Sequence, residues 1–190
     1  LIGAGTLDLG TVATTASVTG SATVTGSLTF NGTTTKTLTI TGDLSGAGTI
    51  DMSGGSLLHV LDLGGANNAI TVFTTAAVAS TVNYTSASAQ QIFSSANYRN
   101  LTISGGGLKT LQGNATVNNT LTLTSGNVNL NTNTLTLGSS GPAPGTLSYT
   151  AGWLYNGSLK RWFEDEVTFA MGDPKGHFPM GARNGAGTLN

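Results

Sequence analysis

With 190 residues and a mass of 19.0 kDa, the chain can form one ordinary domain, or one repetitive domain and part of a second. Thr, Gly, Ser and Asn supply 94 of these residues and charged residues only 8%, which excludes coiled coils and helix bundles. A net charge of −1 offers no basic surface for nucleic acid, and the lack of cysteine excludes disulfides, thiolate catalysis and cysteine-based zinc sites.

The sequence begins at Leu1 on what already reads as repeat sequence, without an initiator Met. It contains no signal peptide and no run of eighteen apolar residues, so we expect no membrane insertion. We therefore expect a fragment of a longer chain whose targeting signal lies outside this sequence.

Internal repetition is the main signal of the first 148 residues. Residues 28–38, LTFNGTTTKTL, are matched by residues 101–111, LTISGGGLKTL, at an offset of 73 residues. This predicts a repetitive domain over residues 1–148, with one copy of the unit at 28–100 and a partial copy at 101–148. A shorter Leu-Thr unit ending in Gly recurs inside it, at 38–42, 101–105, 121–126 and 135–138.

Alternation within these units predicts half-buried β-strands and assigns their faces. In residues 37–41, Leu38 and Ile40 are expected to face inward and the threonines outward. In residues 127–133, Val128 and Leu130 are the inward candidates and asparagines alternate with them. Strand starts recur about every ten to fourteen residues, so two or three strands would make one turn of a coil.

We therefore predict an all-β fold, a parallel β-solenoid with apolar residues stacked inside and Thr, Asn and Ser in ladders outside. In such a coil each rung pairs with the rungs above and below it, so few charges are needed. A β-sandwich remains the alternative, because short strands with frequent turns are typical of that fold too.

Composition changes near residue 149, after the Gly-Pro-Ala-Pro-Gly run at 141–145. Eight of the fifteen charged residues lie from Lys160 onward, and seven of the twelve aromatic residues lie between Tyr149 and Phe178. We expect residues 149–190 to form a short aromatic-rich β segment with strands at 152–155, 159–163 and 167–171. At roughly 40 residues it is too small to fold alone, so it either caps the solenoid or begins a truncated module.

Residues 80–138 resemble the repeat of long secreted surface proteins of the Bacteroidota, adhesin-like chains exported by the type IX secretion route. The matching motifs are Val-Asn-Tyr, a Gln-containing strand, Tyr-x-Asn-Leu and Gly-x-Lys-Thr-Leu, carried by Val82, Asn83, Tyr84, Gln90, Tyr98, Asn100, Leu101, Lys109, Thr110 and Leu111. Residues 157–180 are similar to the module that follows such repeats, through Phe169, Gly172, Asp173 and Pro179; Ala170, His177 and Phe178 depart from its usual Pro, Tyr and Arg. The resemblance implies an extracellular structural or adhesive role and no catalytic residues.

Titratable residues are sparse, and two groups of them are candidate sites. Asp51 and Asp62 on adjacent rungs, with His59 nearby, would resemble the centre of a polysaccharide lyase; the simpler interpretation is that isolated carboxylates cap turns. The acidic run Glu164, Asp165 and Glu166, with Asp173, is a weak candidate for Ca²⁺, and a solvated turn is the favoured interpretation.

Aromatic residues and repeated polar residues supply the remaining candidates. The candidates for contacts to a ligand or to another subunit are Trp153, Tyr155, Trp162 and Phe178. For the first three we favour packing over the open end of the solenoid rather than an aromatic platform that binds sugar. Lys36 and Lys109 share a position in the 73-residue unit and are interpreted as solubilising charges at a turn. Threonine ladders at 37, 39, 41 and at 120, 122, 124 would suit ice binding.

The sequence as a whole predicts a non-enzymatic, extracellular segment of a bacterial surface stalk, adhesin or filament, without a required cofactor. Its expected partners are other copies of itself or neighbouring modules of a longer chain, and surface polysaccharide. The alternatives are a carbohydrate-binding or ice-binding solenoid module and, third, a lyase.

Overall fold

The computed structural model describes residues 5–10, 14–55, 58–75 and 80–162. Within these ranges the chain forms β-strands joined by turns and no helix, so the all-β prediction is confirmed. It follows that none of these residues belongs to a helix long and apolar enough to cross a bilayer.

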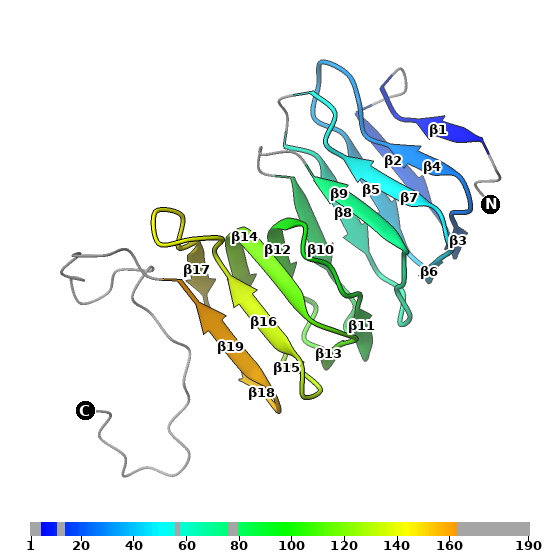
Figure 1. Ribbon diagram of the computed structural model, residues 1–190. Helices are drawn as coiled ribbons and strands as arrows, with labels where there is room; N and C mark the ends of the chain where they lie inside the picture. Colours follow the sequence, from blue (N-terminus) through cyan, green and yellow to red (C-terminus); the bar gives the residue numbers. More distant parts are fainter. Residues whose placement is uncertain (1–4, 11–13, 56–57, 76–79, 163–190) are drawn as a thin grey trace, which may run out of the picture.

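The strands lie on three sides of a coil, and every strand pairs parallel with its neighbours (Figure 1). Side one contains β1 (Thr6–Asp8), β4 (Ser27–Thr29), β7 (Thr49–Met52), β9 (Val72–Thr75), the start of β14 (Ala115–Leu123), β16 (Thr134–Leu137) and β19 (Ser158–Arg161). Side two contains β2 (Thr15–Val18), β5 (Thr37–Ile40), β8 (Val60–Leu63), β10 (Thr81–Tyr84), β12 (Tyr98–Ile103), the end of β14 and β17 (Thr146–Tyr149). Side three contains β3 (Ala22–Thr23), β6 (Leu44–Ser45), β11 (Gln90–Ile92), β13 (Lys109–Leu111), β15 (Val128–Asn129) and β18 (Leu154–Tyr155).

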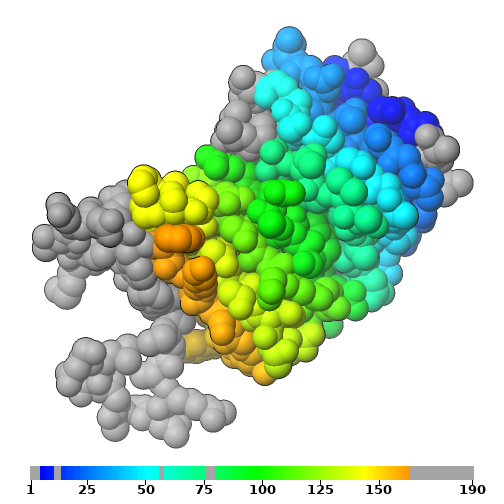
Figure 2. Space-filling view, viewed as in Figure 1, coloured from blue at the N-terminus to red at the C-terminus, as the bar shows by residue number. Residues whose placement is uncertain are grey.

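Side two stacks seven strands in sequence order, so the described residues make about seven turns of a parallel β-solenoid. Figure 2 shows the same order on the surface, where colour passes without interruption from blue to orange. Paired residues lie between 19 residues apart, as for Gln90 and Lys109, and 26 apart, as for Thr120 and Thr146. The solenoid prediction is confirmed, and the antiparallel sandwich is excluded for this part of the chain.

The 73-residue offset does not match this structural repeat. Leu28 lies in β4 on side one, whereas its sequence counterpart Leu101 lies in β12 on side two. The offset is not a whole number of rungs, so it superimposes strands of similar sequence from different sides. The repeat that the structure shows is a single rung.

The interior is filled by the apolar residues that alternation predicted. Leu38 and Ile40 are buried, as are Val128 and Leu130, while the threonines and asparagines between them face outward. Stacking places Leu38 beside Leu61 and Leu61 beside Val82, so each inward position forms a column along the axis. Burial of these columns provides the main favourable free energy of folding.

Aromatic side chains form a second element of the core in the middle of the coil. Phe73, Phe93, Tyr84 and Tyr98 are buried, and the Phe93 and Tyr98 rings stack with centroids 5.2 Å apart. The Tyr98 hydroxyl donates to the Phe93 carbonyl at 2.7 Å, so in the 2.9 Å contact between the two hydroxyls Tyr84 is the donor. Burial raises the pKa of both tyrosines well above the ordinary value, so both stay protonated.

Solenoid pairing continues beyond the expected boundary at residue 148. β17 pairs with β14, β18 with β15 and β19 with β16, all parallel and in the same columns as the rungs before them. Residues 149–161 therefore complete another rung. The predicted strand at 167–171 lies outside the described residues, and so does the end of the one at 159–163.

Candidate functional site

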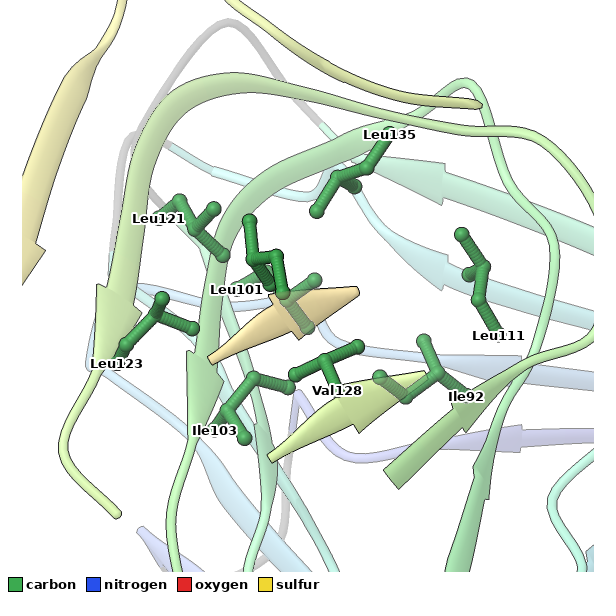
Figure 3. Close-up of a pocket in the computed structure, with 9 residues that line it drawn as sticks. Ile92, Leu101, Ile103, Leu111, Leu121, Leu123, Val128 and Leu135 are labelled. Atoms are coloured by element: carbon green, nitrogen blue, oxygen red, sulfur yellow. The ribbon is translucent and has the colours of Figure 1, made fainter. Parts of the chain in front are cut away.

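One apolar void inside the coil is too small to hold a ligand. This cavity has a volume of about 10 Å³, which is close to the space that one water molecule needs. Figure 3 shows its lining, which is entirely apolar and comes from Ile92, Leu101, Ile103, Leu111, Leu121, Leu123, Val128, Leu135 and Leu154. This void therefore cannot serve as a binding site.

The residues of the lyase hypothesis do not come together. Asp51 lies in β7 on side one and Asp62 in β8 on side two. His59 is fully buried; its Nδ1 accepts from the Lys36 backbone amide at 3.1 Å, and its Nε2 lies 2.8 Å from the Gly54 carbonyl. Both ring nitrogens are thus engaged in structural contacts.

The carboxylates instead bind neighbouring rungs and turns. Asp51 accepts from the Ser53 amide and the Thr74 hydroxyl; burial acts to raise its pKa, but these hydrogen bonds outweigh it and hold the pKa below the usual value. Asp62 accepts from the side chains of Thr39 and Asn83 on the rungs either side. These contacts agree with the interpretation of isolated carboxylates as structural.

Among the described residues no group of three or more His, Cys, Asp or Glu side chains could hold a metal ion. The Ca²⁺ candidates Glu164, Asp165, Glu166 and Asp173 lie outside the described residues, as does Phe178. The hypothesis of a calcium site there stays a prediction.

Three of the four aromatic candidates are described and are solvent-exposed. Trp153 and Tyr155 flank the inward Leu154 on side three, with exposed fractions of 50% and 44%. Trp162 directly follows β19 on side one, and the Lys160 ammonium lies 5.2 Å from the centre of its ring. In the described chain they project outward by strand alternation, and their role as assembly or ligand contacts stays a prediction.

Lys36 and Lys109 are buried, which corrects their interpretation as solubilising charges at a turn. Each lies two positions before an inward-facing leucine, Leu38 or Leu111. Because side chains alternate between the two faces of a strand, each lysine also faces inward. The Lys109 ammonium donates to the Ser86 carbonyl at 2.6 Å and to the Gly107 carbonyl at 3.3 Å. This lysine therefore ties the turns of two rungs together from inside.

Burial lowers the pKa of Lys109 below the ordinary lysine value, which makes its stability contribution pH-dependent. In the window between the lowered pKa and the unfolded value of about 10.4, the unfolded chain binds more protons, so this contribution rises with pH. We predict that wild type gains stability relative to Lys109→Met between pH 7 and about pH 10.5. Urea denaturation at both pH values measures this difference.

The exposed Lys160→Met variant is the control for losing one lysine charge. The stability advantage of wild type over Lys109→Met, expressed as free energy of unfolding, should increase across this pH window. An advantage that stays constant or decreases would contradict a buried ammonium at position 109.

The outer face of side two carries two rows of mainly polar side chains in register. One row is Thr15, Thr37, Val60, Thr81, Asn100, Thr120 and Thr146. The other is Ser17, Thr39, Asp62, Asn83, Thr102, Thr122 and Ser148. Side-chain hydrogen bonds along them, such as Asn100 to Thr81 and Asn83 to Asp62, connect adjacent rungs. The two rows thus form a regular surface that extends over seven strands.

Comparison of the chain with protein-family models, with curated proteins and with solved structures found no significant match. The resemblance to the secreted surface proteins of the Bacteroidota therefore stays a prediction from the motifs of residues 80–138.

Proposed function

We propose that the chain is a structural segment, without catalytic activity, of an extracellular stalk, adhesin or filament. One observation carries this proposal: side two runs in register through seven parallel strands, from β2 to β17. Seven rungs at about 4.8 Å each give a rod segment of roughly 30 Å, and further rungs would lengthen it without a change of design.

The mechanism of such a segment is mechanical. Ladder hydrogen bonds run along the rod axis and the apolar columns stack in the same direction, so bending or stretching the rod must disturb many contacts together. Side-chain bonds add to them, for example from Thr74 to Asp51 across one step of side one. Backbone held in ladders is a poor protease substrate, which suits a protein exposed outside the cell.

The cell-surface location rests on the resemblance of residues 80–138 to exported repeats. The proposed partners of the chain are neighbouring modules of a longer chain or other copies of this one, with surface polysaccharide as a further contact. No cofactor is required for this function.

Negative-stain electron microscopy of the protein as isolated from its source, with the denatured chain mass measured on the same sample, tests the proposal. We expect thin rods much longer than a seven-rung segment, and the mass then separates a giant chain from a polymer of small subunits. Short separate particles of a chain of about this size would overturn the stalk proposal.

The two rows on side two favour binding of ice or of an ordered polysaccharide as a second candidate. Hydroxyl and amide groups recur there at the rung spacing, which can match a repeating ligand. The double variant Thr102→Tyr, Thr122→Tyr should abolish thermal hysteresis or retention on a glycan column, while Thr110→Tyr on side three should not. Wild type showing neither property would eliminate this candidate.

A further inference from the structure

The corner between side one and side two widens from rung to rung near the end of the described chain. In β12 one residue, Arg99, separates Tyr98 from Asn100; in β14 two residues fill the equivalent place between Val117 and Thr120. In the last rung residues 138–145 fill this place, between Leu137, the partner of Val117, and Thr146, the partner of Thr120. The corner therefore overhangs where β14 and this loop meet.

A surface groove of about 200 Å³ lies under this overhang. Its lining includes the cation Arg99, three uncharged polar side chains and two prolines of the loop; these are Asn118, Asn119, Thr146, Pro142 and Pro144. The groove thus combines one positive charge with amide groups and apolar ring faces.

Arg99 has no counterion in the described chain. Its side chain is half-buried, its Nε is buried without a hydrogen-bond partner, and no described residue forms an ion pair with its guanidinium. Partial desolvation of a cation is costly unless it is paired, and an incoming anion would relieve that cost.

The two asparagines are already held in place. Asn118 Nδ2 donates to the carbonyls of Ala96 and Tyr98, at 3.1 and 3.2 Å, and Asn119 Nδ2 donates to Asn100 Oδ1 at 2.8 Å. Asn118 thereby uses both amide protons and keeps acceptor capacity at Oδ1, while Asn119 keeps one donor. Groups fixed in this way can bind sugar hydroxyls at little entropic cost.

We propose that this groove binds a carboxylate-bearing sugar unit of an acidic polysaccharide, with Arg99 pairing with the carboxylate. The planar guanidinium matches a carboxylate through two parallel hydrogen bonds. The amides take the hydroxyls, and Pro142 and Pro144 lie against the apolar face of the ring. The site goes beyond the structural role, because a rod needs no counterion at this corner.

Binding of oligogalacturonate, measured by isothermal titration calorimetry, tests the site, with a neutral cello-oligosaccharide as the second probe. Arg99→Gln should weaken oligogalacturonate binding at least tenfold. Lys160→Gln, which removes an equal charge from an exposed position, should change it less than twofold. Arg99→Lys should be intermediate, because it keeps the charge and loses the planar fork.

Binding of oligogalacturonate by Arg99→Gln as tight as by wild type would overturn the proposal. So would competition by acetate as strong as that by the oligosaccharide at equal carboxylate concentration, because the groove would then bind only a small free anion. An unchanged melting temperature of Arg99→Gln shows that the variant is folded. Either failure leaves the rod proposal standing, since electron microscopy decides that separately.

Discussion

Tyr98→Ala is expected to lower the free energy of unfolding by about 3–5 kcal/mol, as for other large buried aromatic side chains. The side chain is fully buried, stacks on Phe93 and lies 5.5 Å from the Phe73 ring, centroid to centroid. Its loss also leaves the Tyr84 hydroxyl and the Phe93 carbonyl without their partner inside the core. Urea denaturation followed by far-UV circular dichroism measures the change.

Tyr155→Ala is the matched control, since Tyr155 is 44% exposed on the outer face of side three. Its effect should stay within about 0.5 kcal/mol. A loss below about 1 kcal/mol for Tyr98→Ala would mean that the aromatic cluster is not part of a packed core.

Gly46→Ala is expected to cost about 3–5 kcal/mol or to prevent folding, because backbone strain and overpacking act together. Gly46 has a φ of +127°, a conformation that favours glycine, and a Cβ atom there would lie 1.9 Å from the Val24 carbonyl oxygen on the previous rung. Relief of this clash requires the two rungs to separate, which breaks ladder bonds on both sides of the turn. Chemical denaturation gives the difference from wild type.

Gly20→Ala separates the two causes. Gly20 has a φ of +110° and nothing within 4 Å of the position of a Cβ atom. Its substitution should therefore cost only the backbone strain, about 1–2 kcal/mol. Equal losses at positions 20 and 46 would contradict the close stacking of rungs at Gly46.

Strand alternation made the solenoid core predictable. Leu38 and Ile40 are two residues apart with threonines on both sides, and a period of two is a direct consequence of pleated geometry. The same alternation also predicts an inward-facing Lys109, because Lys109 lies two positions before the buried Leu111 on the same strand. The charge of the lysine, rather than its position, led to the incorrect interpretation.

The assignment of strands to sides was not predictable. Leu28 and Leu101 stand in similar Leu-Thr strands, yet they occupy different sides, because all three sides select the same alternating pattern. Side is determined by the lengths of the corners, and these change the rung from 19 to 26 residues. For the same reason Asp51 and Asp62 could not be separated from the sequence alone.

The groove at Arg99 escaped sequence analysis because it depends on three rungs at once. Arg99, Asn119 and Pro144 are far apart in sequence and belong to no motif. The Gly-Pro-Ala-Pro-Gly run did mark an insertion, but the residues beneath it follow only from the register of β14 with β12 and β17.

Disulfide formation between paired cysteines tests the parallel, in-register coil most directly, and the chain has no cysteine of its own to interfere. Thr102 and Thr122 are register partners on the outer face of side two, one strand spacing of about 4.8 Å apart. Thr102→Cys, Thr122→Cys should therefore form a disulfide on mild oxidation. Residues 100 and 122 lie diagonally to each other, about 8 Å apart, so the variant Asn100→Cys, Thr122→Cys should not form a disulfide. Cross-linking of the diagonal pair in preference to the register pair, or of neither pair, would contradict the solenoid.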